Sequence, residues 1–103
     1  MTTSAEFQAL FQRGKRIDRP SFLVLWTETE RPRRVGFAVS RQLRRAVDRN
    51  RIRRRLREAY RLARGAGPET ADVIVVGKKR VLEMEFGALV AELRGAFTLM
   101  SRT

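Results

Sequence analysis

"RNRIRRRLREAYR", residues 49–61, combines dense positive charge with apolar residues at regular intervals. Seven of its thirteen residues are arginine. At about 100° per residue, Ile52, Leu56, Ala59 and the later Ala63 fall in one narrow sector of a helix. A disordered basic tail would have no reason to show this period. The stretch therefore predicts an amphipathic helix over residues 46–63 that packs its apolar stripe against a sheet.

The other side of this helix carries a ridge of mostly cationic side chains, here called the arginine ridge. It consists of Asn50, Arg54, Arg57 and Arg61, with Arg53 and Arg64 on one flank and Arg51 on the other. Surface arginines are also good helix formers that pair with acids at i±4. Glu58, however, can neutralise at most one or two of them. Arg49 falls near the apolar sector, where only its stem can be buried comfortably. We interpret the ridge as a phosphate-binding surface.

The composition of the whole chain supports a polyanionic partner. The 103 residues are enough for one compact domain, and 43% of them are hydrophobic, which is enough for a core. Lys and Arg number 23 against 11 Asp and Glu, so the net charge is 23 − 11 = +12. A folded domain with this much self-repulsion usually meets a polyanion. Nucleic acid is the first expectation and an anionic membrane surface the second.

Two residue types that carry much of enzyme chemistry are absent from the sequence. There is no cysteine and no histidine, so disulfides, thiolate metal sites, thiol nucleophiles and imidazole bases are excluded. No apolar run approaches the roughly 20 residues of a membrane span. The first residues show no secretory signal pattern, and we expect a cytoplasmic protein.

The rest of the chain predicts short helices and strands around the basic helix. We expect one domain over residues 1–103, an α/β sandwich with helices packed on one sheet. The expected elements are a helix opened by a capping box at Thr3 and Glu6 and ending at Gly14, strands over 21–27 and 35–40 that form a hairpin, a strand over 71–77, and a last helix over 82–97.

RNA is a better expectation than DNA for the partner. A helix that reads DNA bases usually projects a mixture of Asn, Gln, Ser and Arg into the major groove. The ridge offers only Asn50 for that purpose, and the short partner helix of a helix-turn-helix is missing. A surface of this kind suits the shape and phosphate positions of structured RNA.

The region around the ridge resembles a known family. "VGFAVSRQLRRAVDRNRIRRRLREAYR", residues 35–61, resembles the signature of the bacterial ribonuclease P protein subunit, which has a V-G-x-x-V-S strand, a basic link and an A-V-x-R-N-R helix. The resemblance extends upstream through "EFQALFQRG" and downstream through "DVIVVGKK", so it covers nearly the whole chain.

The resemblance implies both a fold and a function. The fold is a single α+β domain with the order α-β-β-β-α-β-α, in which the strand–basic helix–strand connection is a left-handed crossover, against the usual rule. The function is that of the accessory protein of an endoribonuclease that removes the 5′ leader from precursor tRNA. The family's catalytic centre lies in its RNA, which also holds most of the Mg²⁺. The implied partners are that RNA and precursor tRNA, with no small-molecule substrate and no membrane.

The resemblance also assigns residues to two surfaces. The RNA-facing set is Arg49, Asn50, Arg51, Arg53, Arg54, Arg57 and Arg61. The set that lines a cleft for the single-stranded leader is Phe7, Phe11, Leu23, Leu25, Lys78 and Lys79. Phe7 and Phe11 are also at a spacing that suits plain core packing, so leader contact and core packing remain alternatives. The link before the basic helix departs from the family, since Arg44-Arg45 replace the usual Gly-Asn.

Three other functions fit parts of the sequence. A structural RNA-binding protein of ribosomal type would use the same ridge without serving an enzyme. A membrane-surface helix would need large apolar residues where this stripe has alanines. An autonomous nuclease could use the acidic pairs Glu28/Glu30 or Glu83/Glu85 for Mg²⁺, but no supporting residues accompany them.

Overall fold

The fold is known from a computed structural model that describes residues 4–102, except for the side chains of Ser4, Glu6 and Phe7. The predicted capping box at Thr3 and Glu6 lies outside these described residues. In chain order the elements are α1 (Ser4–Arg13), β1 (Lys15–Asp18), β2 (Phe22–Glu28), β3 (Arg34–Val39), α2 (Ala46–Ala63), β4 (Ala71–Gly77), the 3₁₀ helix η1 (Lys79–Leu82) and α3 (Phe86–Met100). The predicted order of one helix, three strands, helix, strand and helix is confirmed, with η1 added before α3.

The four strands form one mixed sheet in the order β1-β2-β4-β3. β2 is antiparallel to both β1 and β4, whereas β3 is parallel to β4. The predicted hairpin between residues 21–27 and 35–40 is therefore wrong, because β4 lies between β2 and β3. Consecutive strands usually pair. Here β4 is apolar on both faces, and a strand of that composition is stable only in the middle of a covered sheet.

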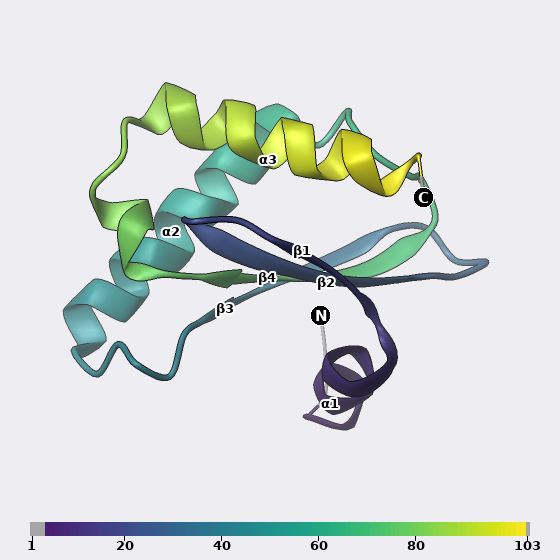
Figure 1. Ribbon diagram of the computed structural model, residues 1–103, viewed down its shortest axis with the longest axis horizontal. Coiled ribbons are helices and arrows are strands. Elements are labelled where there is room, and N and C mark those ends of the chain that lie inside the picture. Colours follow the sequence, from purple (N-terminus) through teal and green to yellow (C-terminus); the bar gives the residue numbers. More distant parts are fainter. Residues whose placement is uncertain (1–3, 103) are drawn as a thin grey trace.

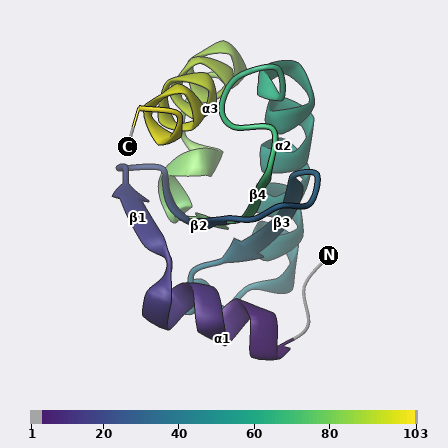
Figure 2. The same ribbon diagram turned by 90° about the vertical axis from the view of Figure 1, so that its right-hand side faces the viewer.

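The connection from β3 through α2 to β4 is a left-handed crossover. Figures 1 and 2 show α2 above the sheet, and β4 lies to the left of β3 when the helix faces the viewer and both strands point upward. In nearly all proteins the crossover connection between two parallel strands of one sheet is right-handed. The left-handed crossover expected from the family resemblance is confirmed.

The helices cover the two faces of the sheet unequally, as Figure 2 shows: α2 and α3 lie on one face and α1 on the other. Side chains alternate between the faces along each strand. Phe22, Val24 and Trp26 of β2 and Val73 and Val75 of β4 join the main core under α2 and α3. Their sequence neighbours point toward α1. Because α1 is short, the face toward α1 is only partly covered.

α2 packs closely on the sheet through the apolar stripe expected from the sequence. Its buried residues are Ile52, Leu56, Ala59 and Ala63. β4 ends at Gly77, where any Cβ would collide with the side chains of Ile52 and Leu56. Glycine at this position therefore lets the basic helix approach the end of the central strand, and the position of the arginine ridge depends on that approach.

α3 begins at Phe86, four residues later than the helix predicted over 82–97, because residues 79–82 form the tighter η1 turn. Arg55 of α2 holds this turn in place. Its Nε donates to the carbonyl oxygen of Val81 at 3.0 Å and its Nη2 to that of Met84 at 2.7 Å. Within residues 4–102, no helix combines the length and apolar character of a membrane span.

Candidate nucleic-acid interface

The arginine ridge is exposed along α2, opposite the buried stripe. Asn50, Arg51, Arg54, Arg57 and Arg61 are exposed, and Arg53 is half-buried. Arg53 donates from Nη2 to Asn50 Oδ1 at 3.1 Å, and Arg61 pairs with Glu58 at 3.3 Å. Guanidinium groups spaced along one helix face can each donate paired hydrogen bonds to phosphate oxygens. The arginines predicted from the sequence to face solvent are therefore exposed, or in the case of Arg53 half-buried, along α2.

Arg49 has a different environment from the ridge residues. Its Nη1 donates to the carbonyl oxygens of Leu43 at 2.8 Å and Ser40 at 3.3 Å, so it holds the link between β3 and α2. Arg44 and Arg45, which replace the family's Gly-Asn, lie in this link. No residue other than glycine has a positive φ in the described chain, so the link does not require glycine.

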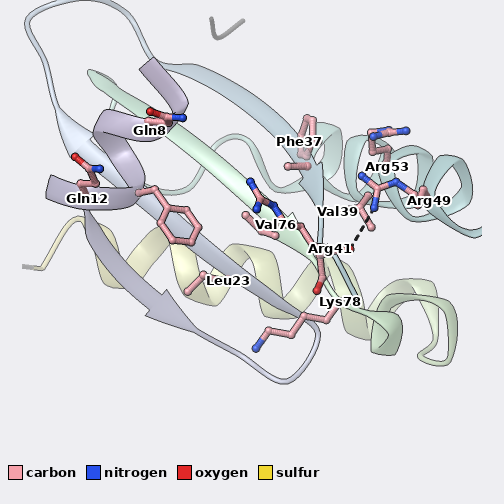
Figure 3. A pocket seen from close by; sticks show the side chains of 13 residues that line it. Gln8, Gln12, Leu23, Phe37, Val39, Arg41, Arg49, Arg53, Val76 and Lys78 are labelled. Atoms are coloured by element: carbon pink, nitrogen blue, oxygen red, sulfur yellow. Dashed lines mark hydrogen bonds between the residues drawn. The ribbon is translucent and has the colours of Figure 1, made fainter. Parts of the chain in front are cut away.

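A cleft of about 800 Å³ opens beside the ridge, between α1 and the sheet (Figure 3). Gln8 and Gln12 of α1 lie on one side of it, and Arg49 and Arg53 of α2 lie on the other. Its remaining lining residues are Phe11, Leu23, Phe37, Ala38, Val39, Ser40, Arg41, Val76 and Lys78. The cleft thus combines an apolar floor from three strands with basic side chains on its rim.

The cleft exists because α1 covers only part of its sheet face. Leu10 of α1 packs on Leu25 and Ile74, and all three are buried. The side chains of Leu23, Ala38 and Val76, further along the same face, remain half-buried. The prediction that Leu25 lines the cleft is wrong, because Leu25 lies under α1 with no exposed surface. Pleat alternation puts Leu23 and Leu25 on the same face, and the end of α1 decides which of them is accessible.

Phe11 is the aromatic side chain of the cleft wall. It is 45% exposed, and the guanidinium of Arg16 lies 5.0 Å from its ring centre. The side chain of Phe7, the other predicted aromatic, lies outside the described residues. Gln8 and Gln12, which no sequence motif singled out, lie three residues before and one after Phe11. The helical spacing of Gln8 and Phe11 is a signal that could have found Gln8.

The two predicted lysines occupy different environments. Lys78 lines the cleft, with its Nζ 2.5 Å from Asp18 Oδ1 and 2.8 Å from the carbonyl oxygen of Arg19. The hydrogen bond and the charge of Lys78 hold the pKa of Asp18 below its ordinary value of 3.8. Lys79 begins η1, is exposed, and does not line the cleft.

The ridge and the cleft form one continuous surface, because Arg49 and Arg53 belong to both the basic helix and the cleft lining. Arg41, in the link after β3, adds a cationic side chain to the rim that the sequence pattern did not reveal. An exposed guanidinium ridge beside a cleft with an apolar floor can hold phosphates on one side and unstacked bases on the other. A small α+β domain with this surface belongs to the class of RNA-binding proteins.

The comparison with known proteins gives the family. Residues 1–101 match the family model of Ribonuclease P, and the chain belongs to this family as a protein component of ribonuclease P. The ribonuclease P protein component of Desulfovibrio desulfuricans is 40% identical over 102 residues, which are 94% of this chain and 78% of that protein. That of Gluconacetobacter diazotrophicus is 37% identical over 87% of this chain and 80% of its own length.

Solved structures support the same assignment. The ribonuclease P protein from Thermotoga maritima superimposes with a TM-score of 0.84 at 25% identity, covering 96% of this chain and 94% of that one. The Staphylococcus aureus protein gives a TM-score of 0.78 at 25% identity over 96% and 92% of the two chains. The chain is thus a subunit of a tRNA-processing endoribonuclease, and its partner is the ribonuclease P RNA. This assignment decides against the alternative of a structural RNA-binding protein of ribosomal type.

Proposed function

We propose that the two parts of this surface bind two RNAs: the arginine ridge binds the ribonuclease P RNA, and the cleft binds the single-stranded 5′ leader of precursor tRNA. The observation that carries the proposal is the position of Arg49 and Arg53, at the boundary of ridge and cleft. An RNA docked on the ridge would lie next to a strand in the cleft. The protein would then hold the leader close to the RNA that cuts it.

The chemistry of the cleft suits a single strand. Its floor at Leu23, Ala38 and Val76 is apolar and half-buried, so it can take up base surfaces that a duplex would keep stacked. Phe11 offers a partly exposed ring at the wall, where a base can stack. Arg41, Arg53 and Lys78 can meet the phosphates that follow those bases along the rim.

We further propose that cleavage takes place in the RNA, with Mg²⁺ held mainly by RNA. The residues that the structure describes contain no group of three carboxylates that could hold a metal ion. In this proposal the side chains of the protein bind and orient two polyanions. Orientation of this kind raises the rate of a reaction by placing the scissile bond against its catalyst.

The test compares precursor tRNA with mature tRNA, which has no leader. Phe11→Ala should leave assembly with the ribonuclease P RNA intact. It should weaken the binding of precursor tRNA alone, by about 1–3 kcal/mol if a base stacks on the ring. Arg51→Ala should instead weaken assembly itself, equally for both tRNAs. Leu62→Ala is the matched control, because Leu62 is also an exposed apolar residue, at 58%, but does not line the cleft.

The measurement is a pair of binding titrations on variants whose fold is checked by circular dichroism. Equal losses for both tRNAs with Phe11→Ala would show that the ring only packs, and the leader assignment of the cleft would then be dropped.

A further inference from the structure

A second basic groove lies on α3, outside the cleft and the arginine ridge. It measures about 390 Å³ and is bordered by three arginines, Arg19, Arg94 and Arg102. Figure 2 places α3 on the side of the sheet opposite to α1, so this groove and the cleft are on different sides of the molecule. Its floor includes three small residues of α3, Ala91, Gly95 and Thr98.

The positive charge of this groove has no acidic partner among the residues that the structure describes. The two nearest acids in the sequence are both engaged: Asp18 with Lys78 at 2.5 Å, and Glu92 with the hydroxyl of Ser21 at 2.7 Å. Neither Arg94 nor Arg102 belongs to an ion pair between described residues. The groove therefore carries arginine charge that no ion pair between described residues offsets, and such a surface attracts anions.

Arg19 shows a second unfavourable feature. Its Nε is buried without an acceptor among the described residues. A buried N–H donor is almost always satisfied in a folded protein. The side chain nevertheless lines the groove together with those of Arg94 and Arg102.

Gly95 also lacks an explanation in packing. A Cβ at this position would meet no heavy atom within 4 Å, so the fold does not require glycine there. Glycine is disfavoured inside helices relative to alanine. What it does provide is a helix surface that another molecule's backbone can approach closely. With Ala91 and Thr98 at helical spacing on either side, it makes the floor of the groove shallow and open.

We propose that this groove binds the phosphodiester backbone of RNA as a second contact site, separate from the ridge and the cleft. Arg94 lies within α3 and Arg102 two residues after its end. The six residues from Arg94 to Met100 alone span about 9 Å along the helix, so the groove has room for more than one phosphate. Guanidinium groups bind phosphate through paired hydrogen bonds, and the small floor residues let the sugar–phosphate chain approach. The inference rests on the family's RNA partnership and not on the leader assignment of the cleft.

The test measures the salt dependence of RNA binding with Arg102→Gln and Arg94→Gln. Removing one arginine that neutralises a phosphate should flatten the log–log slope by about 0.7–0.9. Lys15→Gln is the matched control, since it removes one exposed charge that lines neither groove nor cleft. Arg94 also donates to the carbonyl oxygen of Leu62 at 3.2 Å, and Arg94→Lys, which keeps the charge, should retain most of the slope.

Two titrations distinguish which RNA, the ribonuclease P RNA or precursor tRNA, binds in the groove. A flatter slope with the ribonuclease P RNA alone would assign the groove to that RNA, and a change seen only when precursor tRNA is added would assign it to the substrate. Slopes equal to that of Lys15→Gln in both titrations would overturn the proposal. The proposal for the ridge and the cleft is tested independently, by the Arg51→Ala and Phe11→Ala variants.

A substitution that leaves the charge of the groove unaltered provides an independent test. Gly95→Ala should stabilise α3 and yet weaken RNA binding several-fold, because the new methyl group occupies the floor of the groove. Gly87→Ala is its control on the same helix, since a Cβ there is equally free of contacts and Gly87 does not line the groove. Equal RNA affinities for the two alanine variants would contradict a close approach of the RNA backbone to Gly95.

Discussion

Arg49 donates a hydrogen bond of 2.8 Å from its guanidinium to the carbonyl oxygen of Leu43, six residues earlier in the chain. A second bond, of 3.3 Å, goes from the same Nη1 to the carbonyl oxygen of Ser40. The link between β3 and α2 is therefore held by the first arginine of the RNR sequence. This residue stabilises the fold as well as lying at the cleft.

Replacing Arg49 should affect stability, whereas replacing a ridge arginine should not. We expect Arg49→Ala to lower the free energy of unfolding by about 1–3 kcal/mol, because two link carbonyls are deprived of a charged donor. Arg54→Ala should stay within about 0.5 kcal/mol of the parent, because Arg54 is exposed. Urea unfolding of both variants measures the difference. An Arg49 variant as stable as Arg54→Ala would show that the link holds without these hydrogen bonds.

The arginine ridge should make RNA binding steeply salt-dependent. If about five of its arginines neutralise phosphates, the slope of log K against log salt should be roughly −3 to −5. Arg54→Ala and Arg57→Ala should each flatten it by about one unit, since both are exposed. Affinity titrations with the ribonuclease P RNA at several salt concentrations give the slope. A slope near zero in a folded protein would rule out phosphate contact by the ridge.

The sequence predicted the parts of this fold that depend on local periodicity. The buried stripe of α2 is confirmed residue by residue, because helical spacing alone determines which side chains share a face. Strand pairing was not predictable in the same way. The hairpin expected between β2 and β3 fails because β4, far along the chain, takes the place between them. Nothing local to residues 21–40 signals that insertion.

The excess of arginine was also only partly interpretable from the sequence. Arg33, Arg49 and Arg55 donate to backbone carbonyls that lie 6 to 35 residues away in the chain. Such hydrogen bonds have no sequence pattern. Arg49 was therefore expected only at the RNA-facing surface, and no structural role was expected for Arg33 or Arg55. The accessibility of Leu23 and Leu25 was unpredictable for a related reason: it depends on where α1 ends over the sheet.

Asp72 should make the protein less stable in acid. Its carboxylate, 11% exposed, accepts hydrogen bonds from Arg34 at 2.8 and 2.9 Å and from Arg31 at 3.0 Å. The hydrogen bonds from Arg34, with the charges of both arginines, hold the pKa of Asp72 below its ordinary 3.8. A depressed pKa means that the stabilisation is complete above the unfolded-state value near 3.8 and is lost as the pH falls below it.

The corresponding variant is Asp72→Asn, which keeps the shape and removes the charge. We expect it to be less stable at pH 7 by about 1.5–3 kcal/mol, the range for hydrogen bonds to charged groups. As the pH falls below 3.8, the gap between parent and variant should narrow, because the folded parent must take up a proton at Asp72. Urea unfolding across this pH range provides the measurement. A gap that is constant with pH would mean that the carboxylate charge contributes nothing.

Asp18 should weaken RNA binding at the cleft, because its carboxylate lies 2.5 Å from the Nζ of Lys78. The Asp18 carboxylate is ionised at neutral pH, where it offsets the charge of Lys78, and the hydrogen bond from Lys78 lowers its pKa further from the ordinary 3.8. Asp18→Asn leaves Lys78 held by its bond to the carbonyl oxygen of Arg19. We expect tighter binding of precursor tRNA and a salt slope steeper by about one unit, since one more cation is available to a leader phosphate.

The control for this variant is Glu69→Gln, which changes the net charge equally at an exposed site outside the cleft. Binding of mature tRNA should change little with either variant, because the effect is local to the leader. If Asp18→Asn and Glu69→Gln raised the affinity for both tRNAs alike, the gain would come from overall charge and Lys78 would have no specific part in holding the leader. A gain restricted to Asp18→Asn and to precursor tRNA would locate a leader phosphate at Lys78.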